Sequence, residues 1–185
     1  KDGSVREVES GLSAVDIIKG IGAGLLKAAC CVKINGEVKD IRTVISEDCE
    51  FEVMTFDSLD GRKTFWHTAS HILAQAVKRL YPEARLAIGP SIDTGFYYDF
   101  DVEKPFTADE LQKIEAEMKK IVKENLPIKP SILPREEAIA LMESRGEKYK
   151  VEHIADLDPD ATITFFQQGD YIDMCVGPHL CYTKA

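Results

Sequence analysis

The sequence predicts an α+β protein in which helices pack on one face of a mainly antiparallel sheet. Two observations predict this class. Short apolar runs bounded by turn residues, typical of strands, occur along the whole chain, and two longer segments, beginning near residues 65 and 107, have the apolar period of an amphipathic helix. A chain of 185 residues that is 44% hydrophobic can form one domain or two small ones. The pattern of predicted helices and strands changes near residue 57, which favours two domains.

The first block predicts a small β-rich module with one helix. The stretch from Ser13 to Asp16 places an acid at the favoured third position after a capping residue, which indicates a helix N-terminus, and glycines interrupt that helix a turn later. Asn35-Gly36 is the strongest hairpin signal in the sequence. Strands are expected over residues 4–9, 31–34 and 51–56.

The second block is separated from the first by the polar residues 58–64, which are expected to form a linker. A helix over residues 65–80 comes first. The Thr107-Ala-Asp-Glu110 stretch is a capping box that opens another helix, and a third is expected over residues 134–145. Short strands are expected over residues 86–88, 95–100, 128–133, 149–154, 162–166 and 171–174.

The helix over residues 65–80 carries two histidines on one side. At 100° per residue, His67 and His71 lie together, opposite a broad apolar stripe. Histidines four residues apart project side by side, an arrangement that can share a metal or line a reaction site. The spacing alone leaves two alternatives open, a solvated surface and the wall of a cleft. The apolar stripe comprises Phe65, Ala69, Ile72, Leu73, Ala76, Val77 and Leu80.

The stretch YIDMCVGPHLC near the C-terminus gathers an acid, a thiol and an imidazole, Asp173, Cys175 and His179. Gly177-Pro178 cannot continue a helix, so the chain must turn between Cys175 and His179. Because this turn has no packing role of its own, we expect it to face the two helix histidines.

Composition limits the function classes. No apolar run approaches the roughly 18 residues that suggest a membrane span, and no export signal begins the chain, so a cytoplasmic location is expected. The five cysteines are an odd number and are expected to be reduced. A net charge of −9 argues against a broad electrostatic grip on nucleic acid, although a local basic strip can hold one end of an RNA.

Four motifs, in this order, resemble the editing domain of bacterial threonyl-tRNA synthetases: HTASHIL, GFYYDF, GEKYKV and DMCVGPH. The residues before them resemble the ubiquitin-like TGS module of that family. The resemblance covers essentially the whole chain and implies a β-grasp TGS domain at 1–57, a linker at 58–64 and an α+β editing domain at 65–185. One departure is Val176, where the family usually has Arg.

The resemblance implies that this region hydrolyses the ester of serine mischarged onto threonine tRNA. Serine lacks one methyl group of threonine, which is worth only about 1–3 kcal/mol of discrimination, so a second pocket that excludes threonine by collision adds specificity. The family's site is metal-free, and Tyr98 is implied to contact the ester end of the substrate. The residues implied to act in catalysis are His67, His71, Lys150, Asp173, Cys175 and His179.

The resemblance also implies partners. The acceptor end of threonine tRNA is expected to bind through a few phosphates near Lys78, Arg79 and Lys150, with no role for DNA or a membrane. The chain stops before the family's catalytic and anticodon-binding domains, so ATP and zinc are expected only in the absent catalytic domain. The full-length protein would use ATP to ligate threonine to its tRNA as a homodimer, whereas this fragment is expected to be a monomer.

Two alternatives stay open. In the first, His67, His71, Cys175 and His179 are four zinc ligands, as in the related alanyl-type editing domains, because a His/Cys set is chemically suited to zinc. In the second, the chain only binds tRNA or a partner protein and catalyses nothing. Hydrolysis assays separate the catalyst from the binder, and metal analysis separates the two catalysts.

Overall fold

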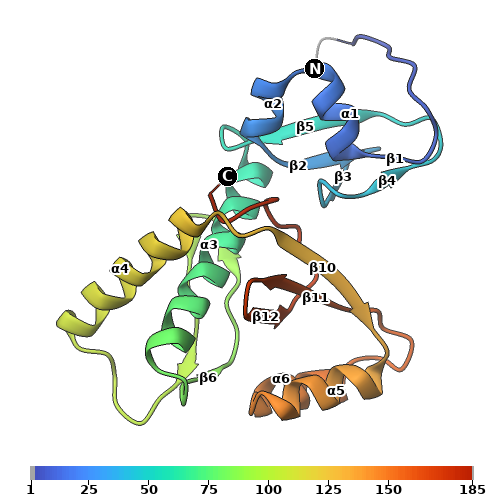
Figure 1. Ribbon diagram of the computed structural model, residues 1–185. Helices are drawn as coiled ribbons and strands as arrows, with labels where there is room; N and C mark the ends of the chain where they lie inside the picture. The colour runs from blue at the N-terminus through green and yellow to red at the C-terminus, as the bar shows by residue number, and fades with distance from the viewer. Residues whose placement is uncertain (1–2, 185) are drawn as a thin grey trace.

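The computed structural model describes residues 3–184 and begins with a small module in which two helices lie over a sheet (Figure 1). Strands β3, β2 and β5 pair antiparallel in that order, and β1 pairs with β4. The helices cover a core that includes Ile18, Val32 and Ile41. The elements are β1 (Leu12–Ser13), α1 (Ala14–Ile21), α2 (Ala23–Ala28), β2 (Ala29–Ile34), β3 (Glu37–Lys39), β4 (Val44–Ile45) and β5 (Phe51–Thr55).

The capping and hairpin signals in this module behave as expected, but the single helix that the sequence predicts is two helices, α1 and α2, with Gly22 between them. The Ser13 side chain accepts a hydrogen bond from the Asp16 N–H and caps α1, and Asn35 and Gly36, with φ of 52° and 82°, turn β2 into β3. The strand expected over residues 4–9 is wrong. Val5 and Val8 are 92% and 49% exposed, so the segment buries neither face and does not join a sheet.

Helix α3 (Leu59–Leu80) begins six residues earlier than expected, so residues 58–64 are not a linker. The Ser58 Oγ accepts a hydrogen bond from the Gly61 N–H at 3.1 Å and caps the helix. Gly61 lies so close to the Thr55 carbonyl that a side chain there would overlap it. The two modules are therefore joined by a tight turn followed directly by a helix.

Helix α3 is covered on both sides, which a single apolar stripe does not predict. Ile72, Ala76 and Val77 pack against α4 (Ala108–Glu124), whose predicted capping box at Thr107 is confirmed. The opposite side is also buried, including His71 and Gln75, whereas Phe65 and Leu80 at the ends of the expected stripe are each 37% exposed. Short strand pairs follow α3 along the chain, β6 (Arg85–Leu86) with β9 (Phe100–Asp101) and β7 (Ser91–Ile92) with β8 (Gly95–Phe96).

The last layer is an antiparallel sheet with the order β10 (Ile128–Leu133), β11 (Ile163–Gln168) and β12 (Tyr171–Met174). Helices α5 (Arg135–Ser144) and α6 (Lys148–Asp156) pack together and bury Met142 and Ile154 against Phe165 of the sheet. The predicted α+β class is confirmed.

Helix α6 corrects the strand expected over residues 149–154. The buried residues are Lys150 and Ile154, which are four positions apart and therefore lie on one helical face.

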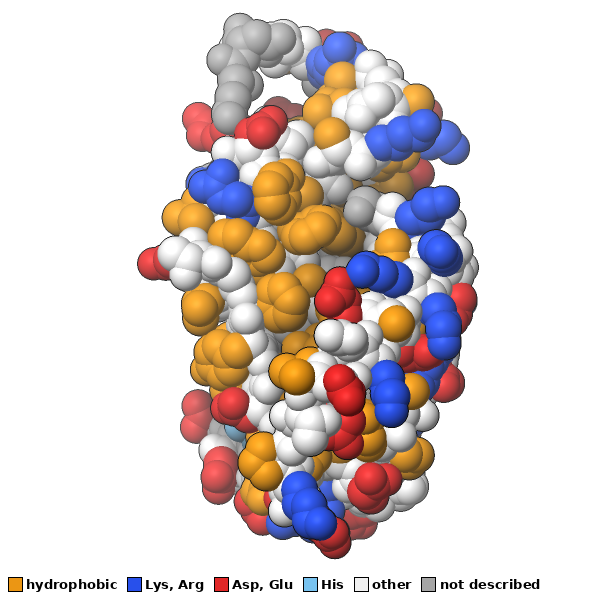
Figure 2. Space-filling view, turned by 90° about the vertical axis from the view of Figure 1, so that its left-hand side faces the viewer, with side chains coloured by type: hydrophobic (Ala, Val, Ile, Leu, Met, Phe, Trp, Pro, Cys, Tyr) orange, Lys and Arg blue, Asp and Glu red, His pale blue; other side chains and the backbone are white. Residues whose placement is uncertain are grey.

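The surface mixes both signs of charge and leaves some apolar side chains exposed. Figure 2 shows one face on which hydrophobic side chains gather across the middle, with Lys and Arg side chains along one edge. Where the modules meet, Lys33 of β2 pairs with Asp60 of α3 at 2.7 Å, and the half-exposed rings of Phe56 and Phe65 stack edge to face. None of the helices within residues 3–184 is long and apolar enough to cross a membrane.

The start of α3 gives a stability prediction. Gly61→Ala should destabilise the fold by about 1–3 kcal/mol, because the new methyl group collides with backbone that cannot move aside easily. Gly20→Ala in α1 is the matched control, since nothing lies within 4 Å of its added carbon, and it should be neutral or stabilise by up to about 1 kcal/mol. Urea unfolding of both variants measures the difference. Equal stabilities would contradict the close approach.

Candidate functional site

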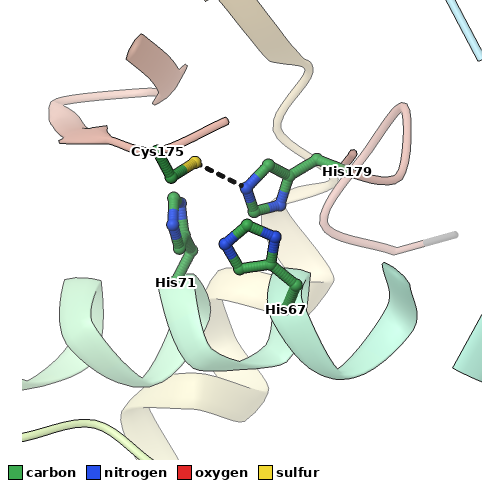
Figure 3. A group of neighbouring side chains, drawn as sticks. All are labelled: His67, His71, Cys175 and His179. Atoms are coloured by element: carbon green, nitrogen blue, oxygen red, sulfur yellow. Dashed lines mark hydrogen bonds between the residues drawn. The ribbon is translucent and has the colours of Figure 1, made fainter. Parts of the chain in front are cut away.

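Helix α3 and the segment after β12 together form a compact cluster of side chains. His67 and His71 project from adjacent turns of α3 toward Cys175 and His179, and one ligand-type atom from each of the four lies within 4.8 Å of the others (Figure 3). The ring of His179 lies 4.0 Å from that of His67 and 4.2 Å from that of His71, measured between centroids. The predicted meeting of the helix histidines and the C-terminal turn is confirmed.

Hydrogen bonds determine which ring nitrogens carry a proton and which keep a free lone pair. The His67 Nδ1 lies 3.3 Å from the Pro178 carbonyl, which can only accept, so Nδ1 carries the proton and Nε2 keeps a free lone pair. The His179 Nδ1 lies 3.0 Å from the Thr68 hydroxyl and its Nε2 lies 3.2 Å from the Cys175 sulfur. The fully buried Nδ1 of His71 has no hydrogen-bond partner within the described residues.

Asp173 supplies a buried negative charge next to the cluster. Its Oδ1 accepts from the Lys150 ammonium at 2.8 Å and from the Met174 N–H, and its Oδ2 accepts from the hydroxyls of Tyr98 and Tyr171 at 2.6 and 2.9 Å. The same Oδ2 lies 3.8 Å from the His71 Nε2. Every predicted site residue thus lies in one connected group.

Burial controls the protonation of the group. It lowers the pKa of all three histidines, of His71 to about 3 and of His179 well below its usual value. Burial also raises the pKa of the Cys175 thiol. For Asp173, burial alone would raise the pKa, but the positive charge of Lys150 and the hydrogen bonds from Lys150 and Tyr98 outweigh it and lower the pKa. At neutral pH the cluster therefore holds neutral imidazoles and a thiol beside an ionised carboxylate.

The edge of the site is formed by the partly buried side chains of His67 and Cys175 and by Val176, which is 89% exposed. Gly177 has φ of 67°, and a side chain there would come within 2.8 Å of the Phe166 ring, so glycine suits this turn on both grounds. Cavities of about 260 and 220 Å³ lie elsewhere, and neither is lined by Tyr98 or by a residue predicted to act in catalysis. The cluster itself is closely packed.

Two residues of the site were not predicted. Thr68 binds His179 and Tyr171 binds Asp173, and their positions next to His67 and two residues before Asp173 were the only signals. The expected phosphate contacts find little support. Lys78 pairs with Glu147, Arg79 pairs with Glu117 and Glu124, and Lys150 is buried.

Comparison with known proteins first defines a class. The TGS domain family matches residues 1–55, the helix-covered sheet of the first module. The chain is therefore a TGS-domain protein in which that module is joined to an α+β domain carrying the His/Cys cluster.

Relatives then identify the family. The chain is 57% identical over 184 residues to the threonine–tRNA ligase of Clostridium perfringens strain 13, and 56% identical over 180 residues to that of Acetivibrio thermocellus. It is 50% identical over 184 residues to that of Clostridioides difficile strain 630. These alignments cover 97% to 100% of this chain but only 28% or 29% of each relative. The chain belongs to the threonine–tRNA ligase family and corresponds to its N-terminal region.

The buried histidines predict an acid-sensitive fold. Below pH 6.5 a histidine of the unfolded chain binds a proton, whereas His71 in the folded protein stays neutral because its pKa is lowered to about 3. The free energy of unfolding therefore falls as the pH falls through 6.5. Between pH 7.5 and 5.5 His71 alone should account for about 1.4 kcal/mol of this loss. Urea unfolding at both pH values should show the loss in the wild type and a smaller one in His71→Asn. Identical pH dependence in the two proteins would show that His71 is not held neutral.

Proposed function

We propose that the His/Cys cluster with Lys150 and Asp173 hydrolyses the ester of serine wrongly attached to threonine tRNA. The observation that carries the proposal is the juxtaposition of neutral imidazoles with a buried lysine–carboxylate pair. Ester hydrolysis needs a base for the attacking water and positive charge or hydrogen-bond donors for the developing oxyanion. The imidazoles can serve as the base, and the lysine can supply the positive charge. The chain belongs to the threonine–tRNA ligase family, and a serine error is chemically expected of an enzyme that must select threonine, which supports the proposal.

His67 is the strongest candidate for the base. Its Nδ1 proton is directed to the Pro178 carbonyl, which leaves Nε2 free to accept a proton from water, and it lies at the partly exposed edge of the cluster. The lowered pKa keeps this ring neutral and competent at physiological pH. The unpartnered Nδ1 of His71 offers a second hydrogen-bonding atom to hold a water.

Lys150 and Asp173 act as a pair. The Lys150 ammonium supplies positive charge for the oxyanion, and the carboxylate keeps that ammonium in place inside a buried site. Tyr98 donates its hydroxyl proton to Asp173, so it supports the pair and lines the ester end of the site. Cys175 and His179, whose Sγ and Nε2 atoms lie 3.2 Å apart, are assigned to the opposite wall, which would collide with threonine's extra methyl group.

A zinc site is the second candidate. The four donor atoms of His67, His71, Cys175 and His179 are a chemically suitable set and all lie within 4.8 Å of one another, so these residues could hold a zinc ion together. The orphaned His71 Nδ1 also fits a ligand atom. Bound there, the metal would supply Lewis-acid chemistry. The Thr68 hydroxyl would then accept from the His179 Nδ1–H, freeing Nε2 for the metal.

The proposed activity predicts selective hydrolysis. Seryl-tRNA should be deacylated and threonyl-tRNA largely spared, because the additional methyl collides with the packed wall. His67→Ala and Lys150→Ala should each lower the rate on seryl-tRNA by roughly 100-fold or more, through loss of the base and of the oxyanion charge. Rates are measured with both esters at fixed salt.

Lys119→Ala is the matched control, since this lysine pairs with Glu115 on the exposed side of α4, and it should leave the rate unchanged. Equal hydrolysis of both esters would contradict the sieve. Binding of tRNA without any hydrolysis would instead support a module that only binds.

Metal dependence separates the two candidates. A metal-free site should keep full activity after dialysis against a chelator, and the purified protein should contain no stoichiometric zinc. If chelation abolishes the activity, added zinc restores it, and zinc does not restore activity to Cys175→Ala, the chemistry belongs to the zinc site. Elemental analysis of the wild type and of Cys175→Ala provides a readout that does not depend on activity.

A further inference from the structure

The segment that carries His179 is held in place by side chains from distant parts of the chain. Residues 175–180 belong to no strand or helix, so their backbone groups need other partners. All four backbone polar groups of His179 and Leu180 are bound by just three side chains. The His179 N–H donates to Asp40 at 3.0 Å and the Leu180 N–H donates to Thr68 at 3.0 Å.

Arg42 binds both carbonyls. Its guanidinium donates to the His179 carbonyl at 3.3 Å and to the Leu180 carbonyl at 2.7 Å, and also to the Ile128 carbonyl at the start of β10, at 2.7 Å. A planar guanidinium with five N–H donors can serve three carbonyls at once, which a lysine ammonium on a flexible chain does less precisely. Arg42 thus ties two separate segments of the second module to one point.

Asp40 fixes the guanidinium in turn. Its carboxylate accepts from the Arg42 side chain at 2.8 and 3.1 Å and from the Arg42 backbone N–H at 2.9 Å, so the two residues form a rigid unit in the loop between β3 and β4. That loop belongs to the TGS module and is anchored by Ile41, which is almost fully buried in the module's core. The unit is about 20% exposed, which protects the ion pair from full solvent screening.

We propose that Asp40 and Arg42 are positioning residues for His179, so that the TGS module is a structural part of the hydrolytic site. They act on the backbone and do not touch the cluster's reacting atoms. Without them His179 and Leu180 lose three of their four backbone hydrogen bonds. The His179 ring would then no longer be held 3.2 Å from Cys175 and about 4 Å from the other two imidazoles. This inference rests on the proposed function.

The test compares two of the contacts that join the modules. Arg42→Ala removes the unit, whereas Lys33→Ala removes only the ion pair to Asp60 and leaves the His179 segment untouched. On seryl-tRNA, Arg42→Ala should lower kcat on the order of 10- to 100-fold with KM nearly unchanged, because misplaced groups affect the reaction step more than binding. Lys33→Ala should keep kcat within about twofold, and Arg42→Lys should recover only part of the loss.

An unchanged kcat in Arg42→Ala would overturn the proposal. An equal loss of kcat in Lys33→Ala would also overturn it, because the general docking of the two modules would then explain the effect. Circular dichroism melting checks that each variant folds. If Arg42→Ala does not fold, Asp40→Asn is measured in its place, because this substitution removes the charge that holds Arg42 but keeps the shape of the side chain.

A second readout does not depend on activity. In protein with nitrogen-15-labelled histidine, the ring signals of His179 should shift in Arg42→Ala and stay in place in Lys33→Ala. If the wild-type protein does not hydrolyse seryl-tRNA, the proposed function fails and this measurement alone decides whether Arg42 positions His179. Unmoved His179 signals in a folded Arg42→Ala protein would overturn the positioning role whatever the activity.

Discussion

The arrangement of the second module depends on the hydrogen bonds and the ion pair that the buried carboxylate of Asp173 accepts. An ionised group that is 2% exposed is stable only when its oxygens are fully hydrogen-bonded and its charge is matched. Asp173 meets this requirement with Lys150 from α6, Tyr98 from the segment between β8 and β9, and Tyr171 from its own strand. These elements must therefore pack against β12 in a single way, which also places His71 of α3 beside the charge.

The same burial gives the site its chemical character. Imidazoles in a dry environment stay neutral at physiological pH, and a thiol there stays protonated, so the cluster offers lone pairs instead of charges. Lone pairs on one side and a lysine–carboxylate pair on the other suit ester hydrolysis. The same lone pairs also suit a soft metal ion, which explains why one cluster supports two candidate mechanisms that differ in metal content.

The TGS module is more than a neighbour of this site. It contacts the second module at the start of α3, through Lys33 and Asp60, and at the C-terminal turn, through Asp40 and Arg42. The second contact satisfies backbone groups that no sheet or helix satisfies. Because an unpaired buried backbone group costs about as much as a lost hydrogen bond, the turn and the module stabilise each other.

The sequence alone determined the α+β class, the hairpin at Asn35-Gly36, the capping box at Thr107 and the meeting of His67 and His71 with Cys175 and His179, because each depends on local chemistry or on a recognisable motif. Tertiary packing decided the rest. Residues 4–9 and 149–154 have strand-like patterns, but whether a segment pairs or coils depends on what lies beside it, and helix α6 is selected by burial of Lys150 and Ile154. The roles of Arg42 and Asp40 were equally invisible, since their partners lie more than 80 residues away and are backbone atoms, which carry no sequence signal.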